Sequence, residues 1–588
     1  MDRDLFEHRL AVLFAVISGL LVVLALRLWQ IQIVQGEYFL RQSEENRLRL
    51  SPVEAPRGHI LDRQGRPLTL NRPAFTVSLL PMELRHPERI IPEIGRRLGM
   101  TPVEVASKLA EARGRPFEPV RLKRDVPKEV IAALEEDRMD LPGVFVQVEP
   151  VRDYPYGPLA AHLLGYLGEI NDRELDSLRS RRYEAGELIG KDGVERIYDR
   201  YLKGRNGQIQ AEVDAQGHPL RVLATVPSQP GNNVKLGVDL DVQKAAEEAL
   251  GSRVGAVVAM DPRDGTIVAL ASHPAFDPNL FATGITTANW NRLLRDPLQP
   301  LLDRSAQGGY PMGSVFKIVT ATAALELGLV QTDSRFYCPG YYNLGGHIFH
   351  DHEAHGNINF LEGIAQSCNV VFWTLARPVG PGHLAQYARM YALGQRTGID
   401  LVQESAGVVP DPDWKRRVWK QIWFAGDTLN TAVGQGYVLA TPLQVARLLA
   451  AVANGGTLVT PHLATEIVSP KGRVVARIAP PPAGEIHLRP ETWAVLHAGL
   501  AAVVTHGTAA SIQIPGLAIA GKTGTAENPH GKPHAWFAGY APADHPQLVV
   551  VAIVENAGFG AEFAAPIVKR VFEAAFGIQE PVPGAPKP

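Results

Sequence analysis

Three short motifs in the second half of the chain carry the residue types needed for acyl transfer. They are Ser314-Val315-Phe316-Lys317, Ser367-Cys368-Asn369 and Lys522-Thr523-Gly524, in that order. Ser314 is the only serine with a lysine three positions further on, and a helix sets two such side chains one turn apart on the same face. An amine at that distance can take the proton of a hydroxyl group. The first motif therefore predicts a serine nucleophile and a lysine base.

The residues that follow Ser314 predict a helix that begins at this serine. A loop ends at Gly313, and the chain stays almost entirely apolar from Ile318 to Gly328. A helix that is apolar on nearly all sides must be buried, and its N-terminus favours negative charge. Taken alone, the motif also fits a serine cap with a lysine that reaches solvent. The two other motifs favour the catalytic interpretation.

The third motif is predicted to follow a strand that borders the site. A strand is expected over residues 517–521, and Lys522-Thr523-Gly524-Thr525 comes directly after it. Gly524 has no side chain, so an extended peptide could add itself to this edge as a further strand.

The surrounding pattern predicts an α/β (α+β) fold. A hairpin is expected in which residues 256–260 and 266–270 flank a Pro-Arg-Asp-Gly turn, after a helix over 241–250. Two more strands are expected at 534–540 and 548–554, followed by a helix from about Glu562 to Phe576. With the strand at 517–521 these give a five-stranded antiparallel sheet covered by helices on both faces.

Length and charge limit the classes of protein that this chain can represent. A chain of 588 residues is too long for a single core. Its formal net charge is -2, with acidic and basic residues interspersed, which gives no electrostatic footprint for nucleic acid. The only cysteines are Cys338 and Cys368, so a disulfide-rich scaffold is excluded.

An apolar segment near the N-terminus predicts an uncleaved membrane anchor. Residues 10–26 contain no charge, and the apolar character continues to Val34, which is long enough to span a bilayer. A signal peptide or a buried core helix are the alternatives, but no small-x-small cleavage site ends the run. We expect a cytoplasmic tail at 1–9, a single span at 10–34 in the cytoplasmic (inner) membrane, and the bulk of the chain on the periplasmic or extracellular side. The flanking charges barely decide this orientation, which is inferred mainly from the chemistry.

The remaining chain divides at a linker rich in proline and asparagine. That linker lies at 227–233 and separates a non-catalytic domain at 35–230 from a catalytic domain at 231–578. Helical periodicity over about 87–141 predicts a helical head within the first of these, and the proline-rich residues 579–588 are expected to be disordered. Arg57 is expected to pair with Asp62, and Glu195 to have a structural role near the start of a helix.

The three ordered motifs resemble the signature of penicillin-binding proteins and serine β-lactamases. The resemblance implies that Ser314 is the nucleophile and Lys317 its base, with a pKa lowered by burial and by a nearby cation, for which Lys522 is the candidate. It also implies roles for the other members of the set. Ser367 would relay a proton, Asn369 would bind the substrate backbone, Lys522 and Thr523 would hold the substrate carboxylate, and the backbone N–H groups of Ser314 and Thr525 would form an oxyanion hole.

Further motifs resemble class B penicillin-binding proteins, and among them the elongation group, penicillin-binding protein 2. They are Arg57-Gly58-His59, Tyr154-Pro155-Tyr156-Gly157, Gly190-Lys191-Asp192-Gly193, Gly426-Asp427-Thr428 and Gly434-Gln435-Gly436. This resemblance implies a peptidoglycan D,D-transpeptidase that cross-links stem peptides during elongation and is acylated by β-lactam antibiotics. The implied partner is a SEDS-type membrane glycosyltransferase, which would bind through the anchor and the non-catalytic domain. Acylation of a serine requires no cofactor, and nucleic acid is not expected as a partner.

A dense group of cysteines, histidines and one aspartate lies between the first two motifs. Cys338, Asp351, His355 and Cys368 could form a closed tetrahedral zinc site of structural type. A Cys338 to Cys368 disulfide is an alternative outside the cytoplasm. Histidines that line a solvated loop are another.

Two competing functions remain open at this point. One is a division-type transpeptidase with the same chemistry, and the other is a sensor or scaffold that binds wall peptide or β-lactam without turnover. A β-lactamase is disfavoured, because no obvious deacylating glutamate is found and the long anchored first domain would have no purpose.

Overall fold

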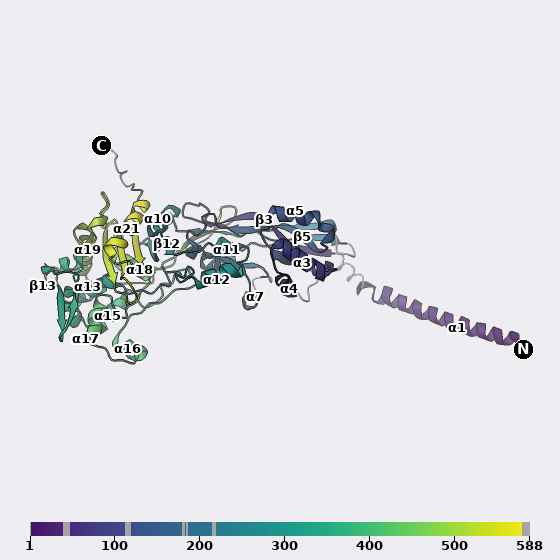
Figure 1. Ribbon diagram of the computed structural model, residues 1–588, viewed down its shortest axis with the longest axis horizontal. Helices are drawn as coiled ribbons and strands as arrows, with labels where there is room; N and C mark the ends of the chain where they lie inside the picture. Colours follow the sequence, from purple (N-terminus) through teal and green to yellow (C-terminus); the bar gives the residue numbers. More distant parts are fainter. Residues whose placement is uncertain are drawn as a thin grey trace, which may run out of the picture. The chain divides into compact units, whose positions relative to one another are not determined.

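The computed structural model describes residues 2–38, 48–111, 119–178, 183, 186–213 and 219–578 (Figure 1). The chain divides into two compact units. Unit 1 contains residues 1–56, 73–150 and 204–230, and unit 2 contains residues 57–72, 151–203 and 231–588. The tail predicted at 579–588 lies outside the described residues.

One helix in the described part of the chain is long and apolar enough to cross a membrane. It consists of α1 (Asp2–Trp29) and a π-helical turn, η1 (Gln30–Val34). The span from Phe6 to Val34 has 29 residues and no buried part. A helix of that length rises about 43 Å, which exceeds the hydrocarbon thickness of a bilayer.

In its described residues, the rest of unit 1 contains two small sheets and three α-helices. One sheet has the order β1-β8-β9 and the other β4-β3-β5. Their strands are β1 (Leu48–Val53), β8 (Gly207–Val213), β9 (Pro219–Val226), β3 (Leu70–Leu79), β4 (Val120–Lys123) and β5 (Val144–Asp153). The helices are α3 (Pro87–Leu98), α4 (Pro102–Glu111) and α5 (Lys128–Glu136). The predicted head is therefore mixed, because β4 lies within it and pairs with β3.

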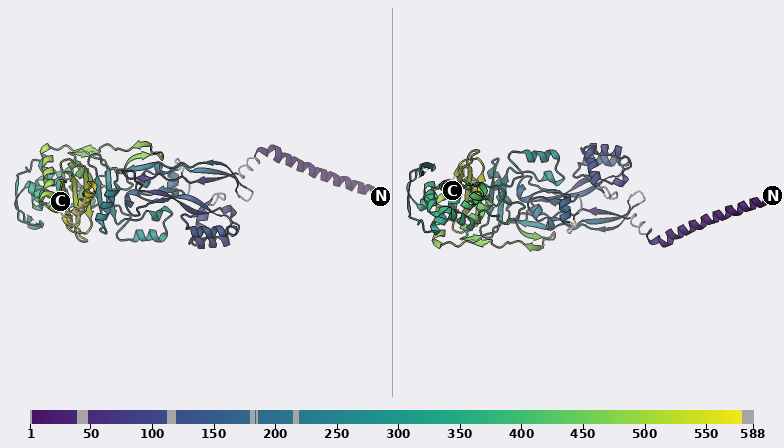
Figure 2. Two further views of the ribbon diagram at one scale, coloured as in Figure 1. Left: turned by 90° about the horizontal axis from the view of Figure 1, so that it is seen from above. Right: turned by 90° about the horizontal axis from the view of Figure 1, so that it is seen from below.

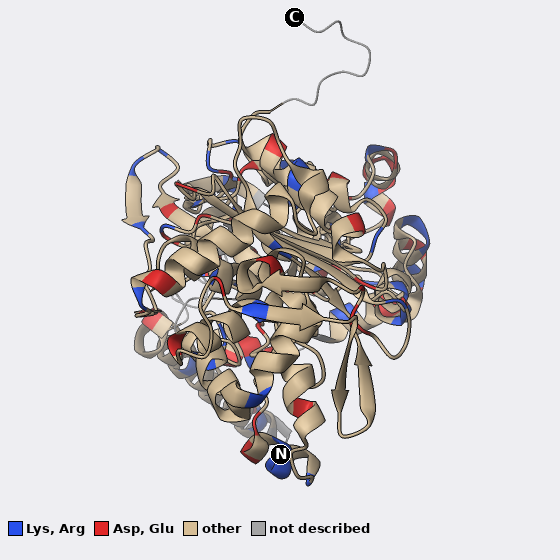
Figure 3. Cartoon of the chain, turned by 90° about the vertical axis from the view of Figure 1, so that its left-hand side faces the viewer, with Lys and Arg blue, Asp and Glu red and all other residues tan. Residues whose placement is uncertain are grey.

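Unit 2 contains the predicted five-stranded sheet, in which every neighbouring pair is antiparallel. The strand order is β12-β11-β23-β22-β21, which makes β21 an edge strand. The bounds are β11 (Gly255–Met260), β12 (Ile267–His273), β21 (Ala520–Ala526), β22 (His534–Ala541) and β23 (Leu548–Val554). Figure 2 shows these early and late segments together, and β11 pairs directly with β23. Acidic and basic residues are interspersed over the face in Figure 3.

Both faces of this sheet are covered, as the sequence predicts. The β22 and β23 side chains are almost all buried, which requires helices on either side. One face packs against α10 (Leu240–Leu250) and α21 (Ala565–Ala575). The other face packs against α18 (Pro442–Ala453), and the core on that side continues to α13 (Lys317–Glu326) and α15 (Asn369–Met390). Burial of each large aliphatic side chain in these layers contributes about 1.5–3 kcal/mol.

The edge strand β21 begins three residues later than predicted. It starts at Ala520, so Lys522 and Gly524 lie inside the strand rather than after it. Gly521 and Gly524 have weak strand propensity, which hides the strand in the sequence. Continuous pairing with β22, from Ala520 opposite Tyr540 to Ala526 opposite His534, determines the strand instead.

A buried ion cluster joins two segments of unit 2 and corrects one predicted pair. Arg57 contacts Glu195 at 2.8 Å and Asp199 at 2.8 Å, whereas Asp62 pairs with Arg66 at 2.6 Å. The Glu195 side chain is fully buried and also pairs with Arg152 at 2.7 Å. Arg152 donates a further hydrogen bond to the carbonyl of Gly58, at 2.8 Å. Glu195 therefore has the structural role expected from the sequence: it lies in the first turn of α8 (Gly193–Ile197), and two cations hold its carboxylate.

Replacement of a buried cation in this cluster should destabilise unit 2. We expect Arg152→Met to lower the free energy of unfolding by about 3–5 kcal/mol, because it leaves a buried acceptor and a weakened ion pair. Arg477→Met is the matched control, since Arg477 is 80 % exposed and pairs with Glu466 at 3.6 Å. That change should cost less than about 1 kcal/mol. Thermal unfolding of the full-length protein measures both, and equal shifts would contradict the buried-cluster account.

Candidate active site

Ser314 lies in a tight turn that leads directly into the buried helix α13. The turn is a 3-10 helix, η5 (Gly313–Phe316), and α13 begins at Lys317. Residues three apart eclipse one another in 3-10 geometry, so Ser314 and Lys317 lie on the same edge of the turn. Ser314 is half-buried, and Lys317 is 1 % exposed. The predicted single helix from Ser314 is thus a 3-10 turn followed by an α-helix.

Glycines allow three chain segments to meet at this turn. The Gly313 N–H donates to the Gly434 carbonyl at 2.9 Å. Gly434 has φ of 73°, and a Cβ there would lie 2.1 Å from the Gly313 carbonyl oxygen. At Gly524 a Cβ would lie 2.9 Å from Trp536 and 3.0 Å from Val315. In the structure, a glycine is required at position 524 because β21 packs closely on the Ser314 turn. From the sequence alone, this glycine is instead explained by the space that a bound peptide needs.

The Lys317 amine joins the first motif to the second. Its Nζ donates to the Ser367 carbonyl at 2.5 Å and to Asn369 Oδ1 at 2.7 Å, and lies 3.3 Å from Ser367 Oγ. Burial lowers the pKa of Lys317 to about 8, and the Asp351 carboxylate acts in the opposite direction. The neutral form of this amine is therefore more accessible near neutral pH than that of an exposed lysine.

Ser367 adopts a backbone conformation that is rare for residues other than glycine. Its φ is 57°, between α14 (Phe360–Ala365) and α15. A left-handed serine costs about 1–2 kcal/mol. This conformation turns both its carbonyl and its hydroxyl towards Lys317, and no sequence signal announces it.

Lys522 from the third motif is fully buried and close to Lys317. Its Nζ donates to the Thr523 carbonyl at 3.2 Å. Burial lowers the pKa of Lys522, and the Lys317 charge lowers it further. The lowered pKa of Lys317 that the sequence predicts is thus caused mainly by burial.

Two residues that the sequence analysis did not assign to the site contact the edge strand. Thr508 lies with its hydroxyl 2.7 Å from the Thr523 hydroxyl. Gln435 donates to the Thr525 carbonyl at 3.3 Å and accepts from the Glu527 N–H at 3.2 Å. The glycine-flanked motif around Gln435 was a usable signal for its role, whereas nothing in the sequence singles out Thr508.

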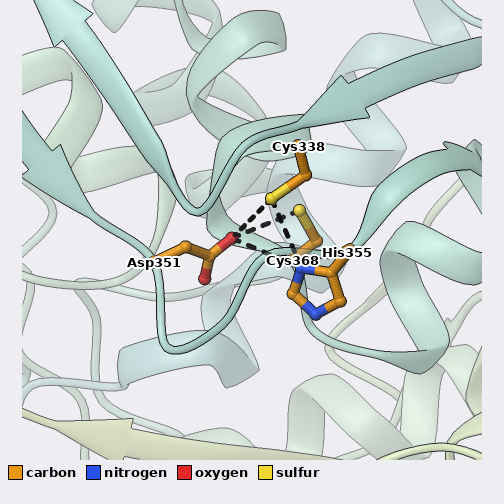
Figure 4. Close-up of side chains that lie close together, drawn as sticks. All are labelled: Cys338, Asp351, His355 and Cys368. Atoms are coloured by element: carbon orange, nitrogen blue, oxygen red, sulfur yellow. Dashed lines mark hydrogen bonds and ion pairs between the residues drawn. The ribbon is translucent and has the colours of Figure 1, made fainter.

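The four predicted metal ligands converge beside the second motif (Figure 4). Their donor atoms all lie within 4.8 Å of one another, and both cysteines are buried free thiols rather than a disulfide. The Asp351 carboxylate also accepts hydrogen bonds from the N–H groups of Asn369 at 2.8 Å and Val370 at 3.2 Å. Asp351 therefore positions the start of α15. His347 and His350 are exposed and lie outside this cluster.

The covered antiparallel sheet, with a serine–lysine turn at its edge strand, defines the class of penicillin-recognising serine enzymes. Residues 255–573 match the family described as penicillin binding protein transpeptidase domain, and residues 52–236 match the penicillin-binding protein dimerisation domain. The chain belongs to the penicillin-binding protein family.

Its relatives include several proteins named peptidoglycan D,D-transpeptidase MrdA. That of Acinetobacter baumannii is 36% identical, over 97% of this chain and 88% of the relative. That of Escherichia coli K12 is 33% identical, over 95% of this chain and 92% of the relative. The resemblance to class B enzymes of the penicillin-binding protein 2 group is thereby confirmed.

Solved structures agree with this assignment. A complex of penicillin-binding protein 2 with MreC from Helicobacter pylori has a TM-score of 0.78 and 28% identity, and the match covers 90% of this chain and 99% of that one. A chain from a peptidoglycan synthase complex that coordinates polymerization and crosslinking has a TM-score of 0.72 and 34% identity. That match covers 98% of this chain and 99% of the other.

The close approach at Gly434 gives a prediction for acylation. Gly434→Ala places a methyl group against the Gly313 carbonyl and should displace the Ser314 turn, so acylation by a fluorescent penicillin should fall by about 10-fold or more. Gly472→Ala is the matched control, because Gly472 has φ of 83° with open space around it. The control should acylate at the wild-type rate, and a similar loss in both variants would mean that backbone strain alone is responsible.

Proposed function

We propose that this protein is a membrane-anchored peptidoglycan D,D-transpeptidase that cross-links stem peptides during cell-wall elongation and is acylated by β-lactams. The observation that carries the proposal is the buried Lys317 amine, which contacts Ser367 and Asn369 and follows Ser314 by one turn. Relatives over nearly the full chain bear the name of this activity.

The proposed reaction proceeds through an acyl-serine intermediate. Neutral Lys317 accepts the hydroxyl proton of Ser314, and Oγ attacks the carbonyl carbon of the penultimate D-alanine. The tetrahedral oxyanion is stabilised by the N–H groups of Ser314 and Thr525. Collapse breaks the peptide bond, and the terminal D-alanine leaves after its nitrogen takes a proton through the Ser367 hydroxyl.

The second half of the reaction releases Ser314. An amine from another stem peptide attacks the acyl carbonyl, loses a proton to Lys317, and forms the cross-link as the Ser314 oxygen leaves and is reprotonated. Asn369 binds the backbone of the substrate. The edge strand β21 accepts that backbone as an added strand, with Lys522 and Thr523 near its carboxylate.

The acyl-enzyme gives the first test. Full-length wild type incubated with a fluorescent penicillin should carry one covalent adduct on Ser314, located by mass spectrometry. Ser314→Ala should carry none, and Lys317→Ala should acylate at least about 1000-fold more slowly, because a serine without its base is a weak nucleophile. Ser469→Ala, a serine in a surface turn, should react like wild type. An adduct on another residue would refute the assignment.

The pH dependence of acylation follows from the lowered pKa of Lys317. Only the neutral amine accepts a proton, so the rate should rise about tenfold per pH unit below the pKa of about 8 and level off above it. Stopped-flow acylation of wild type between pH 5.5 and 10 measures this profile. Lys569→Arg, on α21, should leave it unchanged. A flat profile across this range would exclude Lys317 as the base.

We also propose a structural zinc ion at Cys338, Asp351, His355 and Cys368. Four donor pairs are separated by 3.2–3.8 Å. A tetrahedral zinc ion with bonds of about 2.0–2.3 Å spaces its ligands by about 3.3–3.8 Å. His355 is 4 % exposed and Asp351 fully buried as side chains, so the ligand set is closed to solvent. The ion would stiffen the segment that carries Ser367.

Metal content tests this site without reference to activity. Full-length protein purified without chelator should contain about one zinc per chain, as measured by inductively coupled plasma mass spectrometry. Cys338→Ser and His355→Ala should each lose it, and their thermal unfolding midpoints should fall by several degrees. His347→Ala, an exposed histidine of the neighbouring strand β15 (His347–His350), should keep the metal. Zinc-free wild type with an unchanged midpoint on zinc addition would contradict the proposal.

Location and partner are inferred from α1 and from the relatives. We infer a single span in the inner membrane with unit 2 on the outer side, where the stem peptides lie. A SEDS-type glycosyltransferase is the proposed partner, supported by the likeness to a chain of a peptidoglycan synthase complex. A division-type enzyme is the alternative within the same chemistry, and a relative named stage V sporulation protein D is 31% identical. Repeated turnover on stem peptides would exclude a sensor.

A further inference from the structure

A surface patch of large apolar side chains lies between two helices next to the site. Helix α16 (Pro412–Trp419) is followed by a short connection to α17 (Ala425–Ala432). We call residues 416–424 the 416–424 patch. Four of its large apolar side chains are between 52 and 66 % exposed: Val418, Trp419, Ile422 and Phe424. Trp423 is less exposed and donates a hydrogen bond to Thr428 at 2.8 Å. The exposed cations Arg416, Arg417 and Lys420 lie among them in the sequence.

The patch is held in place from below. Lys415 is 2 % exposed, and its Nζ contacts Asp427 at 2.5 Å. The same ammonium lies 4.9 Å from the ring centre of Phe424 and 5.3 Å from that of Tyr437. The Trp419 ring packs 5.4 Å from Tyr437. Side chains that are fixed in this way yet exposed are characteristic of binding surfaces.

The same elements also form part of the active-site wall. Tyr437 follows Gln435 by two residues, and Gln435 contacts the edge strand at Thr525. Helix α17 packs against α15, which begins at Asn369, and the Ala432 carbonyl accepts a hydrogen bond from Thr320 of α13 at 2.8 Å. Figure 1 shows α17 beside α15. A ligand bound at the patch would therefore lie close to the segment that contains Gln435 and contacts the edge strand of the active site.

We propose that the 416–424 patch binds the glycan strand of uncross-linked peptidoglycan and presents its stem peptides to Ser314. This inference rests on the proposed function. Sugar rings have apolar C–H faces that pack on the rings of Trp419 and Phe424, and the cations at 417 and 420 are complementary to the carboxylates of the stem peptides. The nine residues of the patch are fewer than the 20–30 residues per side of a stable protein interface, which favours a slender polymer.

If the patch binds glycan strands, changes in the patch should affect reactions with polymeric substrates but not reactions with small ones. A β-lactam reacts at Ser314 without reaching the patch, so its acylation rate should not depend on these residues. Binding of a glycan strand should depend on them, and the dependence should appear in KM rather than in kcat.

The test compares two probes on the full-length protein in detergent. The probes are uncross-linked glycan strands with pentapeptide stems and a fluorescent penicillin. Trp419→Ala with Ile422→Ser, and separately Arg417→Glu with Lys420→Glu, should each weaken strand binding by about 10-fold or more and raise KM for cross-linking. Penicillin acylation should stay within about twofold of wild type. Leu294→Ser with Arg295→Glu is the matched control on α12 (Thr287–Arg295), where Leu294 is 57 % exposed.

The outcomes separate the patch from the proposed function. Unchanged strand binding in both patch variants, with normal penicillin acylation, would overturn the inference. The inference would also be overturned if the patch variants lost binding to phosphatidylglycerol vesicles but kept binding to glycan strands, because the patch would then be a membrane contact. A wild type that forms no penicillin adduct would instead refute the proposed function. If the double variant with Trp419→Ala loses penicillin acylation, strand binding by the single variant Ile422→Ser tests the inference instead, because the Ile422 side chain is 66 % exposed.

Discussion

The rest of the structure depends on the burial of one amine, that of Lys317. A lysine at this depth is stable only if its amine has acceptors, and the Ser367 carbonyl and Asn369 side chain supply them. The same burial lowers the pKa of Lys317 to about 8 and prepares it as a base. The buried amine of Lys317 thus lies where α13, the turn before α15 and the edge strand β21, which carries Lys522, come together. The three motifs can act only when these segments are packed together.

Close packing of the backbone makes this arrangement rigid. Gly434 and Gly524 let two segments approach the Ser314 turn within distances that a Cβ would prevent. Asp351 holds the first N–H groups of α15, and Ser367 accepts a left-handed backbone so that its carbonyl faces Lys317. Local strain and tight contacts are thereby concentrated around the reacting atoms, where a displacement of about 1 Å has large effects on rate.

Features that depend on local pattern could be predicted from the sequence, and those that depend on tertiary pairing could not. The apolar run after Ser314 and the hairpin around Asp264 are visible as composition and spacing, and the cluster around Asp351 is visible as a high density of cysteine and histidine residues. The start of β21 is not, because pairing with β22 overrides two glycines. Arg57 finds Glu195 rather than its sequence neighbour Asp62, and Thr508 reaches Thr523 from another element. Each of these contacts joins residues that no local pattern relates.

Direct titration of Lys317 tests the central claim, that a buried and partly neutral amine serves Ser314. Full-length protein labelled with carbon-13 at the lysine ε position would be followed by NMR across pH, with Lys317→Arg and Lys522→Arg used to assign the two buried signals. The account predicts a Lys317 signal with a midpoint near 8. A midpoint at the ordinary lysine value of about 10.4 would show that the amine is charged at neutral pH and would contradict its role as the base.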